Sequence, residues 1–145
     1  MIRRAKPEDA DALAALFRRS YDTLTFLPTL HTPEEDRAHF AKVVANQDVW
    51  VAEEDGGILG FVALKGKEGT FLYVGPEAHG RGVGSRLFEQ AQRARPGGFS
   101  FWAFQKNEQA RRFYEKRGCL AVEFTDGEGN EEREPDVRYE WRPSR

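Results

Sequence analysis

The sequence predicts an α/β (α+β) fold in which four helices flank a mixed sheet of about seven strands, in the order β-α-α-β-β-β-α-β-α-β-β. The hydrophobic residues change from helical to strand spacing after about residue 48. Of the 145 residues, 39% are hydrophobic and 32% are charged, which is typical of a globular protein. No repeat and no Pro/Gly/Ser-rich linker divides the chain, so we expect residues 1–145 to form one domain.

The chain is expected to begin with a short strand over residues 2–5. Pro7 then opens a helix at its first position, and two acidic residues follow it at the favourable end of the helix dipole. Apolar residues recur at helical spacing on one side of this helix. They are Ala10, Leu13, Ala14 and Phe17.

An irregular, apolar linker over residues 20–31 separates the first two predicted helices. Thr32, Pro33 and Glu35 form a capping box with proline at the first helical position, which predicts a second helix up to about Asn46. Tyr21, Phe26, Leu27 and Pro28 of the linker can form an apolar wall or join the core.

Three strands are expected next, over residues 49–53, 58–64 and 70–74. Gly56 and Gly57 make the turn between the first two, which therefore form a hairpin.

The second half of the chain alternates helices with strands. A helix is predicted over residues 82–95, followed by a strand over 99–104 and a helix that Asn107 caps and Gly118 ends. Two last strands, over residues 119–125 and 137–141, are joined by an acidic turn. The strand at 137–141 is interpreted as an exposed edge strand, through which the protein can form a homodimer.

Charge and composition exclude several classes of partner. The formal net charge is −2, so no broad basic surface is available for a nucleic acid. No apolar run approaches the roughly 20 residues of a membrane span, so no membrane partner is expected. Cys119 is the only cysteine, which excludes an internal disulfide and indicates a reducing compartment, the cytoplasm. No metal ligand is assigned.

A glycine-rich turn over residues 75–85 links a predicted strand to the start of a helix. Backbone N–H groups at a helix start lack intrahelical partners and collect anions, and Arg81 and Arg86 add positive charge. The turn lacks the Gly-Lys-Ser/Thr of P-loop nucleotidases. It also fails the dinucleotide-binding pattern, because Ser85 stands at the third small position and Gln105, not an acid, ends the next strand. The turn therefore matches neither of these two nucleotide-binding patterns.

The residues of this turn carry a family resemblance. They are Leu72-Tyr73-Val74-x-Pro76 and then His79-Gly80-Arg81-Gly82-Val83-Gly84. The run resembles the coenzyme A-binding motif of the GCN5-related N-acetyltransferases (GNAT), whose pattern is Gln/Arg-x-x-Gly-x-Gly/Ala. Both glycines of the pattern match, and His79 stands at the Gln/Arg position, where its role is open.

A second motif strengthens the resemblance. Residues 107–119 resemble the family pattern Asn-x-x-Ala-x-x-Phe-Tyr-x-x-x-Gly-Phe, with Asn107, Phe113, Tyr114 and Gly118 in place and Cys119 instead of the last aromatic. By helical spacing, Phe113 is expected in the core and Tyr114 at the edge of the same stripe. The resemblance extends over nearly all of the chain after residue 48.

The resemblance implies a mostly antiparallel, twisted sheet and an enzyme that moves the acetyl group of acetyl-CoA to a primary amine by direct attack. It implies an opening between the third strand of the predicted triplet and the strand at 99–104, and it makes Tyr114 the general acid. A phenol with a pKa near 10 can protonate a departing thiolate. The implied coenzyme-binding residues are Leu72, Tyr73, Val74, His79, Gly80, Arg81, Gly82, Val83, Gly84, Ser85, Asn107 and Tyr114.

Three questions stay open at this stage. The general base is unassigned among Glu77, His31, Asp22 and a water chain. The acceptor amine is unknown, and the acidic stretch at 126–134 is a solvated hairpin tip or an attractor of cationic acceptors. Asn107 binds the coenzyme arm or serves only as a helix cap. The alternative functions are an acyl-CoA-binding regulatory module without turnover and a nucleotide-binding or structural domain.

Overall fold

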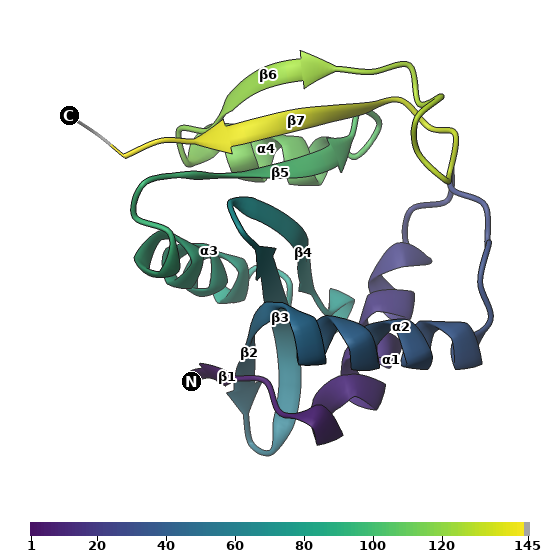
Figure 1. The fold of residues 1–145 in the computed structure, drawn as a ribbon, viewed down its shortest axis with the longest axis vertical. Coiled ribbons are helices and arrows are strands. Elements are labelled where there is room, and N and C mark those ends of the chain that lie inside the picture. The colour runs from purple at the N-terminus through teal and green to yellow at the C-terminus, as the bar shows by residue number, and fades with distance from the viewer. Residues whose placement is uncertain (144–145) are drawn as a thin grey trace.

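The computed structural model describes residues 1–143, whose strands form one seven-stranded sheet in the order β1-β2-β3-β4-β5-β7-β6 (Figure 1). Neighbouring strands are antiparallel except β4 and β5, so the predicted mixed, mostly antiparallel fold is confirmed. The strands are β1 (Ile2–Arg4), β2 (Asp48–Glu54), β3 (Gly57–Lys65), β4 (Glu68–Val74), β5 (Phe99–Phe104), β6 (Leu120–Phe124) and β7 (Asp136–Trp141). The helices are α1 (Ala10–Tyr21), α2 (Pro33–Asn46), α3 (Val83–Ala94) and α4 (Glu108–Lys116), with 3₁₀ turns at Pro7–Asp9 and Pro76–Ala78.

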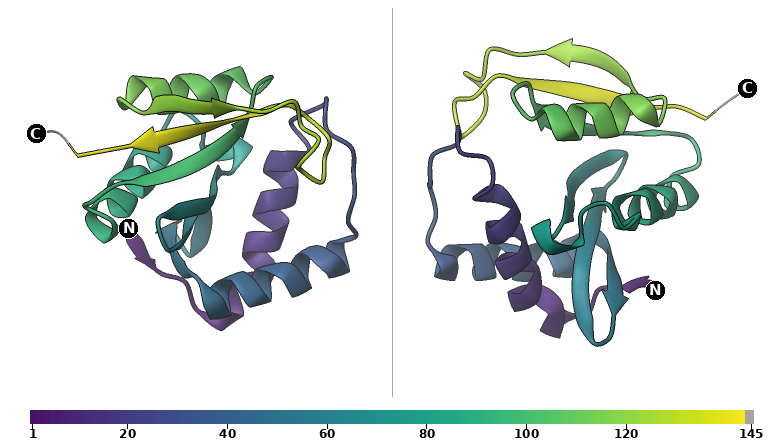
Figure 2. Two further views of the ribbon diagram at one scale, coloured as in Figure 1. Left: turned by 45° about the horizontal axis from the view of Figure 1, so that its top comes forward. Right: turned by 180° about the vertical axis from the view of Figure 1, so that it is seen from behind.

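The two faces of the β2–β4 half of the sheet are covered by different helices. α1 and α2 pack on one face and α3 on the other (Figures 1 and 2). Strand alternation explains the division, because Phe61 and Ala63 of β3 face α1 and α2 whereas Val62 and Leu64 face α3. These four side chains are fully buried and form the centre of two core clusters.

Side-chain hydrogen bonds hold the chain where it enters α2 and at the 3₁₀ turn before α1. At α2 the predicted capping box is confirmed: the Glu35 N–H donates to Thr32 Oγ1 at 3.1 Å, and the Thr32 N–H donates to Glu35 Oε1 at 2.8 Å. Pro7 opens a 3₁₀ turn and not an α-helix, so α1 begins three residues later than expected. Asp9 holds this turn by accepting the Lys6 N–H at 2.7 Å and Arg3 Nη1 at 2.8 Å.

Strands β4 and β5 pair for only two residues. Glu68 lies opposite Ser100 and Gly69 opposite Phe101, and beyond this point the strands run apart (Figure 1). At the junction the Phe101 ring lies against Gly69, where a Cβ atom would be 2.1 Å from Phe101 Cε1. The glycine lets the two halves of the sheet join closely at one end while they separate at the other.

The expectation that the last strand lies at the sheet edge is wrong. β7 lies between β5 and β6 and pairs antiparallel with both, because the chain returns through the 125–135 connection into the space between them. The edge strand on this side is β6, which exposes Leu120 and Phe124. Among residues 1–143, no helix combines the length and the apolar character that crossing a membrane requires.

Candidate active site

A cavity of about 390 Å³ lies where the end of β4, the start of α3 and one face of α4 meet. Every predicted site residue except Arg81 lines it, so the two motifs, more than 20 residues apart in the sequence, form one site. The guanidinium of Arg81 instead lies 3.2 Å from Glu54 at the surface. For Arg81 only the backbone N–H remains available to the site.

The turn before α3 presents a row of free backbone donors. Within residues 1–143, the N–H groups from Gly80 to Ser85 have no hydrogen-bond partner, and the first helical bond runs from the Arg86 N–H to the Gly82 carbonyl. Gly80 and Gly82 have φ angles of +80° and +76°, which residues with side chains rarely adopt. A run of free amides at the positive end of a helix is suited to a phosphate group.

Gly84 is required by packing and not by its backbone angles. A Cβ atom at this position would lie 2.9 Å from Cε2 of Phe113, closer than the two atoms can approach. Phe113 is partly exposed and lines the cavity, while Tyr114 is 5% exposed. Tyr114 is thus more deeply buried than Phe113, which packs against the core from its edge, so the expected order of burial is reversed.

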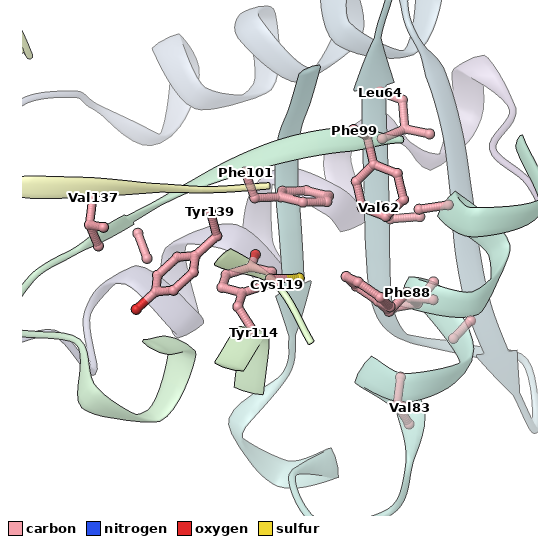
Figure 3. Close-up of a cluster of buried hydrophobic side chains, with 14 of the residues drawn as sticks. Val62, Leu64, Val83, Phe88, Phe99, Phe101, Tyr114, Cys119, Val137 and Tyr139 are labelled. Atoms are coloured by element: carbon pink, nitrogen blue, oxygen red, sulfur yellow. The ribbon is translucent and has the colours of Figure 1, made fainter. Parts of the chain in front are cut away.

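Tyr114 lies between two aromatic rings. Its ring stacks on Phe101 and on Tyr139, each with a centroid separation of 5.5 Å (Figure 3). Burial raises the pKa of Tyr114, and the nearby phenol of Tyr73 raises it further, so the group stays protonated at neutral pH. In the described part of the chain its hydroxyl has no hydrogen-bond partner, which leaves the proton available.

A second, smaller cavity of about 90 Å³ fills the opening between β4 and β5. It is lined on one side by residues 70–73 and on the other by residues 101–104, as the predicted opening requires. Tyr73, Asn107 and Tyr114 line both cavities. The phenol of Tyr114 therefore belongs to the wall that the two spaces share.

His79 and Asn107 make specific hydrogen bonds. Nε2 of His79 lies 3.1 Å from the Val74 carbonyl, and Nδ1 lies 3.3 Å from the amide nitrogen of Gln109 on α4. Both ring nitrogens are occupied, so His79 ties the turn to α4. Asn107 caps α4 by accepting the Ala110 N–H at 3.1 Å, and the same residue lines both cavities.

The candidate bases lie outside both cavities. Glu77 pairs with Arg19 at 3.0 Å, His31 contacts Glu131, and Asp22 is exposed beside α1. No carboxylate of the described residues lines either cavity, and no group of three or more metal-ligand side chains occurs among them.

Eight further residues line the large cavity without having been predicted. They are Ser20, Thr23, Leu24, Ala78, Gln109, Ala110, Phe113 and Arg117. Ser20 could have been found, since it lies on the buried face of α1 with Leu13 and Leu16, where a polar residue is unusual. Its hydroxyl donates to the Val74 carbonyl at 3.1 Å and so joins α1 to the site. Nothing in the sequence around the other residues indicates that they line a site.

Comparison with known proteins decides the family. A sequence profile for the acetyltransferase (GNAT) domain matches residues 45–118, half of the chain. The chain belongs to the GNAT family. Its resemblance to this family is thus confirmed, and it is an acetyl-CoA-dependent N-acyltransferase whose acceptor bears an amine.

Individual relatives agree with this assignment. Peptidyl-lysine N-acetyltransferase YiaC of Escherichia coli (strain K12) is 41% identical over 83 residues, which are 55% of this chain and 55% of that protein. Peptidyl-lysine N-acetyltransferase YjaB of Salmonella typhimurium is 33% identical over 119 residues, 81% of each chain. The solution structure of apo YjaB from Escherichia coli superposes with a TM-score of 0.80 at 27% identity, covering 99% of this chain and 98% of that one. A regulatory module without turnover is not favoured by these relatives.

Proposed function

We propose that this GNAT protein acetylates the side-chain amine of lysine in a peptide or protein, with Tyr114 as general acid. The observation that carries the proposal is that the free amides of residues 80–85 and the phenol-bearing Tyr114 line one cavity. Relatives named as peptidyl-lysine N-acetyltransferases support lysine as the acceptor.

The residues present fit the coenzyme. The free amides from Gly80 to Ser85 would bind its pyrophosphate, and the glycines let that group approach the backbone closely. Leu72, Tyr73 and Val74 would line the thioester arm as it runs toward Tyr114. The bound thioester supplies the acetyl group.

The chemical step follows from the residues around the opening. The neutral amine nitrogen attacks the thioester carbonyl, a C–N bond forms and the C–S bond breaks. Tyr114 gives its proton to the departing sulfur and recovers one from solvent, while the amine loses its proton to solvent. Burial that raises the pKa of Tyr114 also raises that of a thiolate formed beside it, which keeps the proton transfer nearly balanced.

Backbone of β4 would stabilise the charge that develops on the carbonyl oxygen. Past Gly69 this strand has no pairing with β5, so its edge in the opening faces the reacting group. One such donor contributes on the order of 3 kcal/mol to the transition state of related acyl transfers.

The acidic hairpin over residues 126–134 favours a cationic acceptor. It reaches the linker between α1 and α2, where Glu131 contacts His31. After burial, the charge of Glu132 is the largest influence that raises the pKa of Tyr21 and of Tyr73, which supports an acidic approach to the opening. A lysine amine has a pKa near 10.4 and arrives protonated, so these carboxylates would attract it.

The remaining expectations stay predictions. These are a single domain, a cytoplasmic location, the lack of nucleic acid and membrane partners, and a homodimer, for which β6 is one of the two edge strands.

The test is an assay of free thiol with acetyl-CoA and a panel of peptides, followed by mass spectrometry of the products. We expect a mass increase of one acetyl group on lysine-containing peptides and none on the same peptides with arginine in place of lysine. Acetylation confined to α-amino groups would overturn lysine as the acceptor. Binding of acetyl-CoA without thiol release on any amine would support the regulatory module instead.

A further inference from the structure

Arg117 occupies the cavity wall directly after α4. The carbon at the centre of its guanidinium lies 3.6 Å from the centroid of the Phe113 ring, and Nη1 donates to the Phe113 carbonyl at 3.0 Å. Nη2 contacts the hydroxyl of Ser85 in the first turn of α3. The group is thus held in a fixed orientation by partners that are all neutral.

Unlike the two arginines of α4, Arg117 forms no ion pair with a residue that the structure describes. Arg111 and Arg112 of α4 form ion pairs with Glu115 and Glu108 at 4.0 and 3.7 Å. Arg117 has no carboxylate within 4.0 Å among the residues that the structure describes. Burial lowers its pKa, but a guanidinium remains charged under all working conditions. The charge of Glu89 acts on Arg117 only from beyond 4.0 Å. A partly buried cation without a contacting counter-ion, placed in a ligand cavity, indicates that the ligand supplies the negative charge.

The chemistry of the guanidinium favours a phosphate. Its planar set of donors matches two oxygens of a phosphate group, and the Phe113 ring supports its other face. Coenzyme A carries a pyrophosphate and, on the ribose at the end away from the thiol, a 3′-phosphate. The amides from Gly80 to Ser85 provide donors for the pyrophosphate, and Arg117 contacts the side chain of Ser85 at the last position of this row. Within the part of the chain that the structure describes, its remaining donors are free for a second phosphate.

We propose that Arg117 binds the 3′-phosphate of acetyl-CoA and makes the enzyme selective for the complete coenzyme. The inference rests on the proposed function, because it assumes that the pyrophosphate lies on the glycine-rich turn. Gly84 contributes indirectly, since its missing side chain admits the Phe113 ring that supports the guanidinium.

The experiment compares acetyl-CoA with acetyl-3′-dephospho-CoA on the wild type, R117Q and R117K, with R112Q as control. Arg112 is a matched control because it lies on α4, which Arg117 directly follows, is exposed and does not line the cavity. A charge-assisted hydrogen-bonded pair corresponds to about a tenfold change in affinity. We therefore expect R117Q to raise KM for acetyl-CoA about tenfold with little change in kcat, and R117K to recover part of the loss.

The truncated coenzyme separates the outcomes. With acetyl-3′-dephospho-CoA, the wild type and R117Q should have KM values within about twofold of each other. An equal loss with both coenzymes would overturn the assignment to the 3′-phosphate, and unchanged KM values with both would show that Arg117 only packs against Phe113. Thermal unfolding and far-UV circular dichroism confirm that the variants fold. Failure of the wild type to use acetyl-CoA would instead count against the proposed function.

Discussion

Tyr114 and Tyr139 stack with their ring centroids 5.5 Å apart and an interplanar angle of 27°, but their hydroxyls have different surroundings. The Tyr139 hydroxyl donates to Glu115 at 2.6 Å and accepts from Arg111 at 3.1 Å, and this residue lines neither cavity. Tyr114 lines both cavities and its hydroxyl has no partner within residues 1–143. Removing the hydroxyl from each tyrosine in turn therefore distinguishes a catalytic role of the hydroxyl from a structural one.

Replacement of Tyr114 by Phe should lower kcat about 100-fold, because the departing sulfur loses its proton donor. KM for acetyl-CoA should change by less than about twofold, since the ring and its stacking are retained. Steady-state kinetics with a lysine peptide measure both values. Tyr139→Phe is the control: we expect it to keep kcat while lowering the free energy of unfolding by about 2 kcal/mol through loss of the bonded hydroxyl.

Tyr73 provides a second comparison, because it also lines both cavities. Tyr73→Phe should reduce kcat by less than about fivefold if Tyr114 is the acid. The opposite order of effects, with Tyr73→Phe the more damaging change, would assign the proton transfer to Tyr73.

Gly84→Ala should destabilise the protein by about 1–3 kcal/mol, because the added methyl group overlaps the Phe113 ring. Displacement of that ring should also raise KM for acetyl-CoA. Urea unfolding and steady-state kinetics measure the two effects. Gly97→Ala is the control, since nothing lies within 4 Å of a Cβ atom there, and it should leave both values nearly unchanged. Normal stability of Gly84→Ala would show that α4 can move away from α3 at little cost.

Asp9→Asn should lower the free energy of unfolding at pH 7 by about 2 kcal/mol, because the carboxylate bonds the Arg3 guanidinium at a partly buried position. The bond to Arg3 holds the pKa of Asp9 below its usual range, so the charged form stabilises the folded state above the pKa of the unfolded chain. This stabilisation is lost as the pH falls through the lowered value, so the difference between wild type and variant should shrink below about pH 4. Urea unfolding at several pH values tests this. Asp11→Asn, at an exposed position of α1, is the control and should change the free energy of unfolding little. A difference between wild type and Asp9→Asn that does not vary with pH would contradict a stabilising role for the charged form of Asp9.

The combined change Glu131→Gln and Glu132→Gln should raise KM for a lysine peptide about threefold at low salt, with KM for acetyl-CoA unchanged. The effect should diminish at high ionic strength, because the attraction acts through solvent. Glu128→Gln, on the same acidic stretch, is the control for a general change in charge. If the control raised KM as much as the double variant, Glu131 and Glu132 would have no specific role at the opening.

Much of the fold was predictable because its signals are local. The capping box at Thr32 and Glu35, the change of hydrophobic period and the glycine-rich turn each depend on residues a few positions apart. Family motifs then identified Tyr114 and the turn, and the cavity includes all of their predicted residues except Arg81.

The features that sequence reasoning missed depend on contacts between distant elements. The position of β7 inside the sheet follows from its pairing with β5 and β6, which strand patterns do not specify. Phe113 lines the cavity and packs against α3 at Gly84, and Arg117 enters the site through Ser85, 32 positions away. Such contacts arise only when the helices are placed in space.

The separation of β4 from β5 leaves an opening that connects the two faces of the sheet. Tyr73 and Tyr114 line both the larger and the smaller cavity, so under the proposed function a donor bound at the glycine-rich turn would leave the other side of the opening free. Donor and acceptor can then occupy the protein together, without either blocking the entrance of the other. In the proposed reaction the acetyl group therefore passes directly from donor to acceptor and is not stored on a side chain of the protein between two half-reactions.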